Sequence, residues 1–371
     1  MLPRRCHDSC SAVPGLAALL LVLALPGLSA AFGFIDAIGN GTQLPCLDPR
    51  SLALGGAVSV GVDDEWALFL NPARIPSTGD PSVSLGAIYG GWREKVPVAG
   101  VVIQKGEDIS LTPYAAASMP LADGLAAAAG FCTVSIFDYS GANLITDNPF
   151  DPYIVTSTQF LEASGQLNEA LAGLSYSLTD DLGLGLSGGL RFGSADIIET
   201  DYEYDQDTTL ITTYDRSWEE SEFCWHAGVK ADYDFGTAGL TYASETDHYP
   251  VRVAIGGMVK AEHLSNTKVG FEIEAFDPGE DVEYIARLMI ENPTADFLNT
   301  LVGVSFTDGP ICDRPALGFA VGFEMSWNPV TASVAYSYRS RSRNSQYSGL
   351  QFYDEFDDSA TLLSASVTYR L

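Results

Sequence analysis

The sequence predicts an all-β fold, a transmembrane antiparallel β-barrel of about 14 strands that is closed by an N-terminal hatch. Three observations predict it: an export signal, apolar and polar residues that alternate in segment after segment, and no later apolar run as long as a spanning helix. The composition agrees, because 36 Gly, 17 Tyr and 18 Phe are typical of sheets and only 18% of the residues are charged.

Residues 1–31 are predicted to be a signal peptide that is removed on export. Arg4 and Arg5 form the basic start, residues 13–28 are apolar, and residues 29–31 offer a small-residue cleavage site. The apolar stretch is shorter than the roughly 20 residues that span a bilayer, and two prolines interrupt it. We therefore expect a cleaved signal, and a mature chain that is integral to the outer membrane of a diderm bacterium.

Cysteine spacing and charge exclude several classes of function. Cys46, Cys132, Cys224 and Cys312 follow the signal at spacings that suit no zinc motif. Disulfides and inert buried thiols both remain open for them. The formal net charge of −29 repels nucleic acid. We expect no metal, no cofactor and no nucleic-acid partner.

The alternation is clearest in residues 182–192, where every second residue is apolar and the residues between are mostly Gly and Ser. Residues 315–328 repeat it. The last strand, 358–371, ends the chain on Leu371, with Tyr369 two positions before it. This end resembles the signal read by the barrel assembly machinery, a partner we expect during biogenesis, although Leu replaces the usual Phe or Trp.

Many predicted strands suit a tilted membrane crossing of about 9–11 residues. Short turns alternate with long polar loops, such as 196–219 and 342–357. An exported soluble β protein would also alternate, but here one face is Leu, Val and aromatic and the other is Gly, Ser, Thr and charged, which favours a barrel. Short helices are expected at 160–171 and 282–290. The predicted strands are 82–90, 96–104, 109–118, 124–136, 170–179, 182–195, 220–235, 237–246, 251–262, 267–277, 299–308, 315–328, 330–341 and 358–371.

Residues 32–80 do not alternate cleanly and are rich in Gly, Asp, Asn and Pro. A barrel of this size encloses more space than its own side chains fill. We therefore predict that residues 32–80 form a hatch inside a barrel made by residues 81–371.

Two stretches of this segment carry a resemblance. Residues 49–57 read PRSLALGGA, and residues 62–73 read VDDEWALFLNPA. Their order resembles the N-terminal signature of the FadL-type outer-membrane transport family, which the related barrel protein of type IX secretion shares. The resemblance implies a fourteen-stranded barrel with a hatch that passes hydrophobic molecules such as long-chain fatty acids.

The resemblance also implies a route for the ligand. In that family the ligand leaves sideways through a gap at an inward kink of the third strand, so Asn71, Pro72 and Ala73 would lie beside the opening. The third predicted strand contains Pro113, which has no N–H to donate to a ladder. Pro113 is therefore a candidate for the gap, and an ordinary edge proline is the alternative.

Two arginines are candidates for binding a ligand carboxylate. Arg191 and Arg339 lie on predicted inward faces. The alternative is that they balance acids of the lumen such as Glu272, Glu274 and Glu324.

No recognisable catalyst is present, because the three later histidines belong to no catalytic motif, and we expect no enzymatic activity. Acidic runs at 201–207 and 354–358 would suit either Ca²⁺ or a solvated loop.

The predicted function is passive uptake of hydrophobic small molecules by a monomer in contact with membrane lipid. A non-transporting barrel that serves as an interaction or secretion platform is the alternative.

Overall fold

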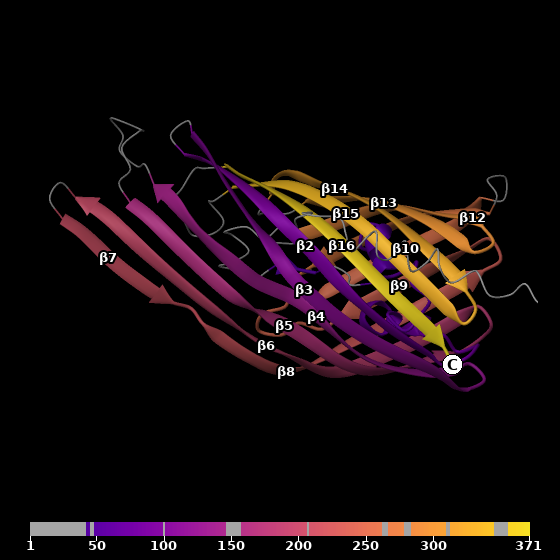
Figure 1. Cartoon of the computed structure of the whole chain (residues 1–371). Coiled ribbons are helices and arrows are strands. Elements are labelled where there is room, and N and C mark those ends of the chain that lie inside the picture. Colours follow the sequence, from indigo (N-terminus) through magenta and orange to yellow (C-terminus); the bar gives the residue numbers. More distant parts are fainter. Residues whose placement is uncertain are drawn as a thin grey trace, which may run out of the picture.

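The computed structural model describes residues 42–44, 48–98, 101–145, 157–205, 208–261, 266–277, 283–308, 312–344 and 355–371. Fourteen strands form a closed antiparallel barrel (Figure 1). The ring closes between β16 (Glu355–Arg370) and β2 (Ser82–Val98). The predicted fold class is confirmed.

The other strands of the ring are β3 (Val101–Ala122), β4 (Leu125–Ile145), β5 (Ser157–Ser177), β6 (Leu182–Asp205), β8 (Trp218–Tyr233), β9 (Gly236–Ala243), β10 (Arg252–Ala261), β11 (Thr267–Phe276), β12 (Glu283–Ala295), β13 (Leu298–Asp308), β14 (Cys312–Trp327) and β15 (Val330–Asn344). β7 (Thr208–Asp215) pairs with β6 beyond the ring. Ahead of the barrel lie β1 (Thr42–Gln43), α3 (Pro49–Ala53), α4 (Ala67–Leu70) and the 3-10 helix η1 (Pro72–Arg74).

The apolar face of the strands points outward. On β6, Leu184, Leu186 and Leu190 are 42–58% exposed, whereas Ser187 and Arg191 between them are buried. Burial in hydrocarbon removes such apolar surface from water, so this outer wall suits a bilayer. None of the helices in the described ranges is long and apolar enough to cross a membrane.

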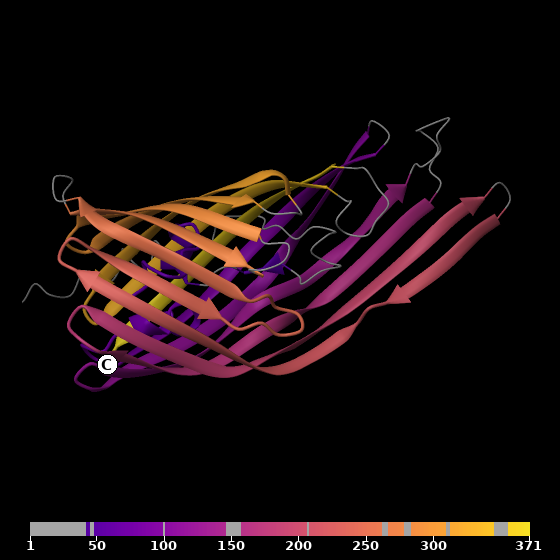
Figure 2. The ribbon, with the colours of Figure 1, turned by 180° about the vertical axis from the view of Figure 1, so that it is seen from behind.

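One end of the barrel carries the short turns, and the C-terminus lies there too (Figure 1). Aromatic rings stack at this end: Tyr233 on Phe235 with centroids 5.5 Å apart, and Phe297 on Trp327 at 6.4 Å. Such pairs form the girdle at a membrane interface, and short turns mark the periplasmic end of a barrel. At the other end β6 and β7 extend furthest, and the β2–β3 hairpin, β4 and β5 also project beyond the other strands (Figures 1 and 2).

Several predicted boundaries were wrong. The segments 96–104 and 109–118 are not separate strands, because β2 runs to Val98 and β3 continues unbroken from Val101. The helices expected at 160–171 and 282–290 are parts of β5 and β12, since hydrogen bonding to neighbouring strands outweighs weak helical spacing. Much of the predicted loop 196–219 is β6 and β7. The predicted number of strands is nevertheless fourteen, because one predicted strand too many at 96–104 compensates for the unpredicted β12.

The N-terminal segment lies inside the barrel, at the end with the short turns (Figure 2). Asp48 caps α3 by accepting a hydrogen bond from the backbone N–H of Ser51 at 2.9 Å, and proline follows the cap. The helix ends before Gly55, whose φ of +79° favours glycine. The side chains of Leu52 and Leu54 are buried in the lumen core. We call the described residues 48–76 the hatch.

Candidate functional site

Glycines of the barrel wall let the hatch dock closely. A Cβ on Gly185 of β6 would lie 2.1 Å from the backbone N of Ala73. On Gly228 of β8 it would lie 1.9 Å from Oδ1 of Asn71, and Gly303 of β13 meets the hatch backbone in the same way. Only glycine permits this approach of backbone to backbone.

Asn71 anchors the hatch with both ends of its amide. Its Oδ1 accepts from the backbone N–H of Ala73 at 3.2 Å and caps η1, in which Pro72 is the first residue. Its Nδ2 donates to the carbonyl oxygens of Ser59 at 2.8 Å and Val229 at 3.2 Å. The Asn-Pro-Ala motif therefore fastens the hatch to β8.

Wall hydroxyls satisfy backbone carbonyls at the ends of the hatch helices. Ser187 Oγ donates to the carbonyl of Leu68 at 2.8 Å, and Ser175 Oγ donates to that of Ile75 at 2.9 Å. Thr241 donates to the hatch as well. These bonds satisfy carbonyl groups that short helices leave unpaired, so the polar inner face of the wall is used for docking.

A buried ion network holds the first half of the hatch. Glu272 accepts hydrogen bonds from the backbone N–H groups of Val58 at 2.9 Å and Ser59 at 2.7 Å. Arg287 donates to Glu272 at 2.9 Å and to the carbonyl of Gly55 at 3.0 Å. Both charged side chains are at most 1% exposed. Charge-assisted bonds in such a dry site are strong only while both partners are present.

The other lumen acids also have cationic partners, on the hatch for Glu291 and Glu324 and on the wall for Glu274. Arg50 of α3 pairs with Glu291 at 2.7 Å and with Glu324 at 3.2 Å. Glu274 pairs with Arg287. The acids that we expected to balance Arg191 and Arg339 thus have other partners.

The docking of the hatch is expected to weaken as the pH rises. Burial raises the pKa of the Asp48 carboxyl to about 7, against the opposing hydrogen bond from Ser51. The docked hatch therefore holds a proton that a released hatch loses near 3.8, so the stabilisation is complete below that pH and is lost as the pH rises through 7. We expect protection of the α3 amides against hydrogen exchange to fall between pH 5 and pH 8 by an amount on the order of a few kcal/mol.

The matched variant is Asp48→Asn, which keeps a capping oxygen and cannot titrate. Its protection factors are expected to change less between the two pH values than those of the wild type. Equal changes in both proteins would exclude Asp48 as the titrating group.

The barrel wall has an opening between β3 and β4. Their pairing extends only from Ala122 opposite Leu125 to Ala115 opposite Phe131. Beyond that point β3 still pairs with β2 and β4 still pairs with β5. The facing edges of β3 and β4 therefore separate towards the long-loop end.

β4 turns inward beside this opening. Its pairing with β5 shifts register between Thr133 and Ser135, which places a bulge there. Every residue from Cys132 to Phe137 is buried, so the usual alternation is lost over this stretch. A strand whose two faces are both covered has left the plane of the wall.

The free edge of β4 is taken by β1. Thr42 lies opposite Ile136 and Gln43 opposite Ser135, and the backbone N–H of Leu44 donates to the carbonyl of Val134 at 2.9 Å. Ser135 pairs with β5 on its other side. β1 therefore occupies the edge that β3 leaves, as a cover of three residues.

The residues predicted for the opening lie in different parts of the barrel. Pro113 lies in β3, two residues beyond the last pair with β4, but β3 is the second strand of the barrel and not the third. The third strand is β4. Asn71 and Ala73 lie against β8 and β6, whereas the ring of Phe69 reaches Gly130 at the base of the opening. A part for Pro113 or for the Asn-Pro-Ala motif in ligand exit stays a prediction.

The two predicted carboxylate ligands lie in different surroundings. Arg191 is fully buried; it pairs with Glu169, donates to Thr246 Oγ1 at 3.0 Å and stacks over the Tyr249 ring at 4.1 Å. It thus balances a lumen acid, though not one of those expected. Arg339 lies on β15, opposite Ala360 of β16. Their binding of a ligand carboxylate stays a prediction.

Cys132 and Cys224 are free, buried thiols. Cys46, Asp207 and Asp354 lie outside the described residues, as do the side chains of Cys312, Asp205, Glu355, Asp357 and Asp358. Among the residues that the structure places, no three His, Cys, Asp or Glu side chains are arranged to hold a metal ion.

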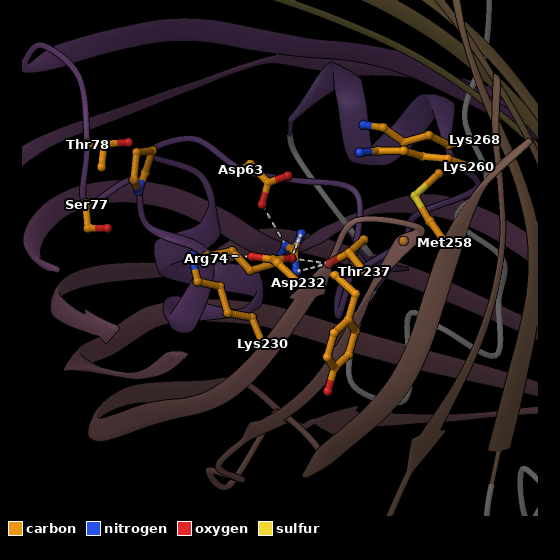
Figure 3. A pocket seen from close by; sticks show the side chains of 13 residues that line it. Asp63, Arg74, Ser77, Thr78, Lys230, Asp232, Thr237, Met258, Lys260 and Lys268 are labelled. Carbon is orange, nitrogen blue, oxygen red and sulfur yellow. Dashed lines mark hydrogen bonds and ion pairs between the residues drawn. The ribbon is translucent and has the colours of Figure 1, made fainter. Parts of the chain in front are cut away.

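Sequence reasoning missed a group of basic residues at the short-turn end. Lys230, Lys260 and Lys268 line one cavity together with Arg74 (Figure 3). Their positions in the sequence could have indicated this group, because each lysine lies on an inward face of a strand and within a few residues of a short turn.

A closed antiparallel barrel with an apolar outer wall, an internal hatch and a wall whose second and third strands separate defines a hatch-bearing transmembrane-type β-barrel. The chain is similar to a FadL homologue of Pseudomonas aeruginosa, with a TM-score of 0.64 and 12% identity over 89% of this chain and 99% of that one. It is also similar to the toluene transporter TodX of Pseudomonas putida, with a TM-score of 0.60 and 13% identity over 89% and 99% of the two chains.

The toluene transporter TbuX of Ralstonia pickettii gives a TM-score of 0.59 and 11% identity over 88% of this chain and 99% of that one. No protein-family model and no curated protein matches the sequence. The fold is therefore that of the FadL-type outer-membrane β-barrels.

Proposed function

We propose that the protein resides in the outer membrane as a channel for passive uptake of hydrophobic small molecules, with lateral exit through the wall, and that it has no enzymatic activity. The opening between β3 and β4 carries this proposal, because it interrupts the wall of the barrel and is covered, among the residues that the structure describes, by β1 and Leu44. A hydrophobic molecule is more stable in lipid than in water, so a sideways route leads to its natural destination.

Apolar side chains beside the opening support a hydrophobic ligand. Ile136 and Leu167 are buried there, and the ring of Phe137 packs edge-on against Trp218 with centroids 5.2 Å apart. Apolar pockets with a few polar groups are the usual binding sites for small hydrophobic ligands. Repacking of these side chains would admit such a ligand above the hatch.

The hatch supports the same function. It blocks the direct path along the barrel axis with polar bonds to the wall, such as Asn71 to Val229 and Arg287 to Gly55. Hydrophilic solutes are then excluded, while a molecule that partitions into lipid needs only the side opening. The toluene transporters named above share this fold, and an aromatic hydrocarbon is a suitable first probe.

A reversible crosslink tests the lateral route. Gln43 and Ser135 lie directly opposite each other on antiparallel strands, a spacing that suits a disulfide. In the double variant Gln43→Cys and Ser135→Cys, made with Cys46→Ser and Cys132→Ser to remove the native thiols three residues away in sequence, oxidation would fix β1 over the opening. We expect toluene uptake into proteoliposomes to fall about tenfold on oxidation and to recover with reductant.

The control is Ser135→Cys with Cys46→Ser and Cys132→Ser, which lacks the second new thiol and is expected to be insensitive to oxidant. Undiminished uptake by the crosslinked protein would overturn lateral exit while leaving a channel. Absence of uptake by the reduced protein and the wild type would overturn the channel itself and favour an interaction platform.

A further inference from the structure

The chain is strongly acidic, yet it gathers its lysines in one place. Of its five lysines, Lys230, Lys260 and Lys268 line a single cavity of about 380 Å³. Arg74 of the hatch is a fourth cation there, against the carboxylates of Asp63 and Asp232. We call this cavity the lysine pocket. A surplus of positive charge in a chain with a net charge of −29 requires a specific reason.

The three lysines enter the pocket from three strands. Lys260 is on the face of β10 that holds the buried Met258, whereas Val259 between them is 54% exposed on the outer wall. Lys230 of β8 shares the inward face with buried His226, and Lys268 of β11 shares it with buried Glu272. Figure 3 shows Lys260 and Lys268 side by side, with their amines pointing the same way.

Two of these lysines oppose each other directly. Lys260 is the cross-strand partner of Lys268 in the pairing of β10 with β11. Like charges at directly opposite positions destabilise a sheet. The charge of Lys268 is partly balanced, because its ammonium group pairs with Glu291 at 3.1 Å. For Lys260, no ion pair or side-chain hydrogen bond is found with the residues that the structure describes.

The remaining cations are already held in place. Arg74 is 3% exposed and pairs with Asp63 at 2.8 Å, and its Nη1 donates to Thr237 Oγ1 at 3.0 Å. Lys230 lies 3.7 Å from Asp232. Arg74 and Lys230 are thus paired with carboxylates of the pocket, which leaves Lys260 and Lys268 as the cations that an incoming anion would meet.

We propose that the lysine pocket binds an oxyanion group, a carboxylate or a phosphate, between Lys260 and Lys268. Such a group would accept charge-assisted hydrogen bonds from both ammonium groups and relieve their repulsion. Ser77 and Thr78 supply hydroxyl donors, and Met258 supplies an apolar wall for the first carbons of an attached chain. The pocket lies at the short-turn mouth, on the far side of the hatch from the lateral opening, and this binding goes beyond the proposed uptake.

Inorganic phosphate is the first probe, because it has no tail that would bind in an apolar lumen. We expect phosphate to raise the thermal unfolding temperature of the protein in a non-ionic detergent, an effect that high NaCl weakens. The test variant Lys260→Glu places a carboxylate opposite Lys268. It is expected to unfold at a higher temperature than the wild type without phosphate and to bind phosphate at least about tenfold more weakly by calorimetry.

Arg216→Gln, which removes an exposed cation at the opposite end of the barrel, is the control and is expected to bind phosphate like the wild type. Hexyl phosphate and hexanoate distinguish the source of the oxyanion, since tighter binding than phosphate and acetate indicates an amphiphile head group and equal binding indicates a free anion. Phosphate binding that Lys260→Glu leaves unchanged, or that Arg216→Gln loses equally, would overturn the proposal. Toluene uptake reports separately on the channel.

Discussion

Replacing Gly185 by Ala is expected to displace the hatch and to open the barrel to small hydrophilic solutes. The added Cβ would lie 2.1 Å from backbone atoms of Pro72 and Ala73, which no rotamer change can relieve. Overpacking of this kind typically costs about 1–3 kcal/mol, and here the strain falls on the docking of η1 rather than on the ladder of the wall. Liposome swelling in arabinose would measure the gain in permeability.

Gly188→Ala on the same strand is the matched control. Its Cβ would lie on the outer face, 3.1 Å from the ring of Phe223, a side chain that is 69% exposed and free to move. Both variants add one carbon to β6, so a general weakening of the strand would affect them alike. If Gly185→Ala and Gly188→Ala show the same low permeability, close docking at Gly185 does not hold the hatch.

Replacing Arg287 by Leu is expected to destabilise the folded protein by about 3–5 kcal/mol, because it leaves buried carboxylates without their cation. Glu272 and Glu274 are at most 1% exposed and both pair with Arg287. Unfolding in urea from lipid vesicles would measure the loss. The hatch would lose the hydrogen bond to the carbonyl of Gly55 at the same time.

Arg216→Leu provides the comparison, since that guanidinium is 50% exposed in its pair with Glu199. Its loss is expected to cost less than about 1 kcal/mol, as for most exposed ion pairs. A triple variant with Arg287→Leu, Glu272→Gln and Glu274→Gln should recover part of the stability, because neither position then holds a buried carboxylate that has lost Arg287. An effect of Arg287→Leu as small as that of Arg216→Leu would show that water reaches this network.

Strand positions were predictable where one face of the strand meets lipid. Residues 182–192 alternate with one glycine on the apolar face, and the structure places them on one strand with the leucines outside. Prediction failed where the alternation is weak, as in 160–171 and 282–290. In those segments the conformation depends on pairing with neighbouring strands, and a short stretch of sequence does not show which strands those are.

The candidate site was predictable only in part. The Asn-Pro-Ala motif pointed to a hatch, but its contacts with Gly185 and Gly228 depend on strands more than a hundred residues further along the chain. Pro113 lies two residues beyond the last pair of β3 with β4, but the bulge beside the opening lies in β4, between Thr133 and Ser135. Nothing in the residues around that bulge marks it, because a register shift belongs to a pair of strands.

The sequence by itself determined that this chain alternates between an apolar and a polar face, that it carries an acidic surplus and that a segment rich in Gly, Asn and Pro precedes the strands. These properties can be read from residues that are close in sequence. The two-residue period of a strand and the need to face either lipid or the lumen set the residue type at each position. Only the tertiary structure decided where the wall opens, which carboxylates hold the hatch and that Lys260 faces Lys268. Those features depend on the register of distant strands around a closed ring, since a shift of one residue would turn every side chain to the other face.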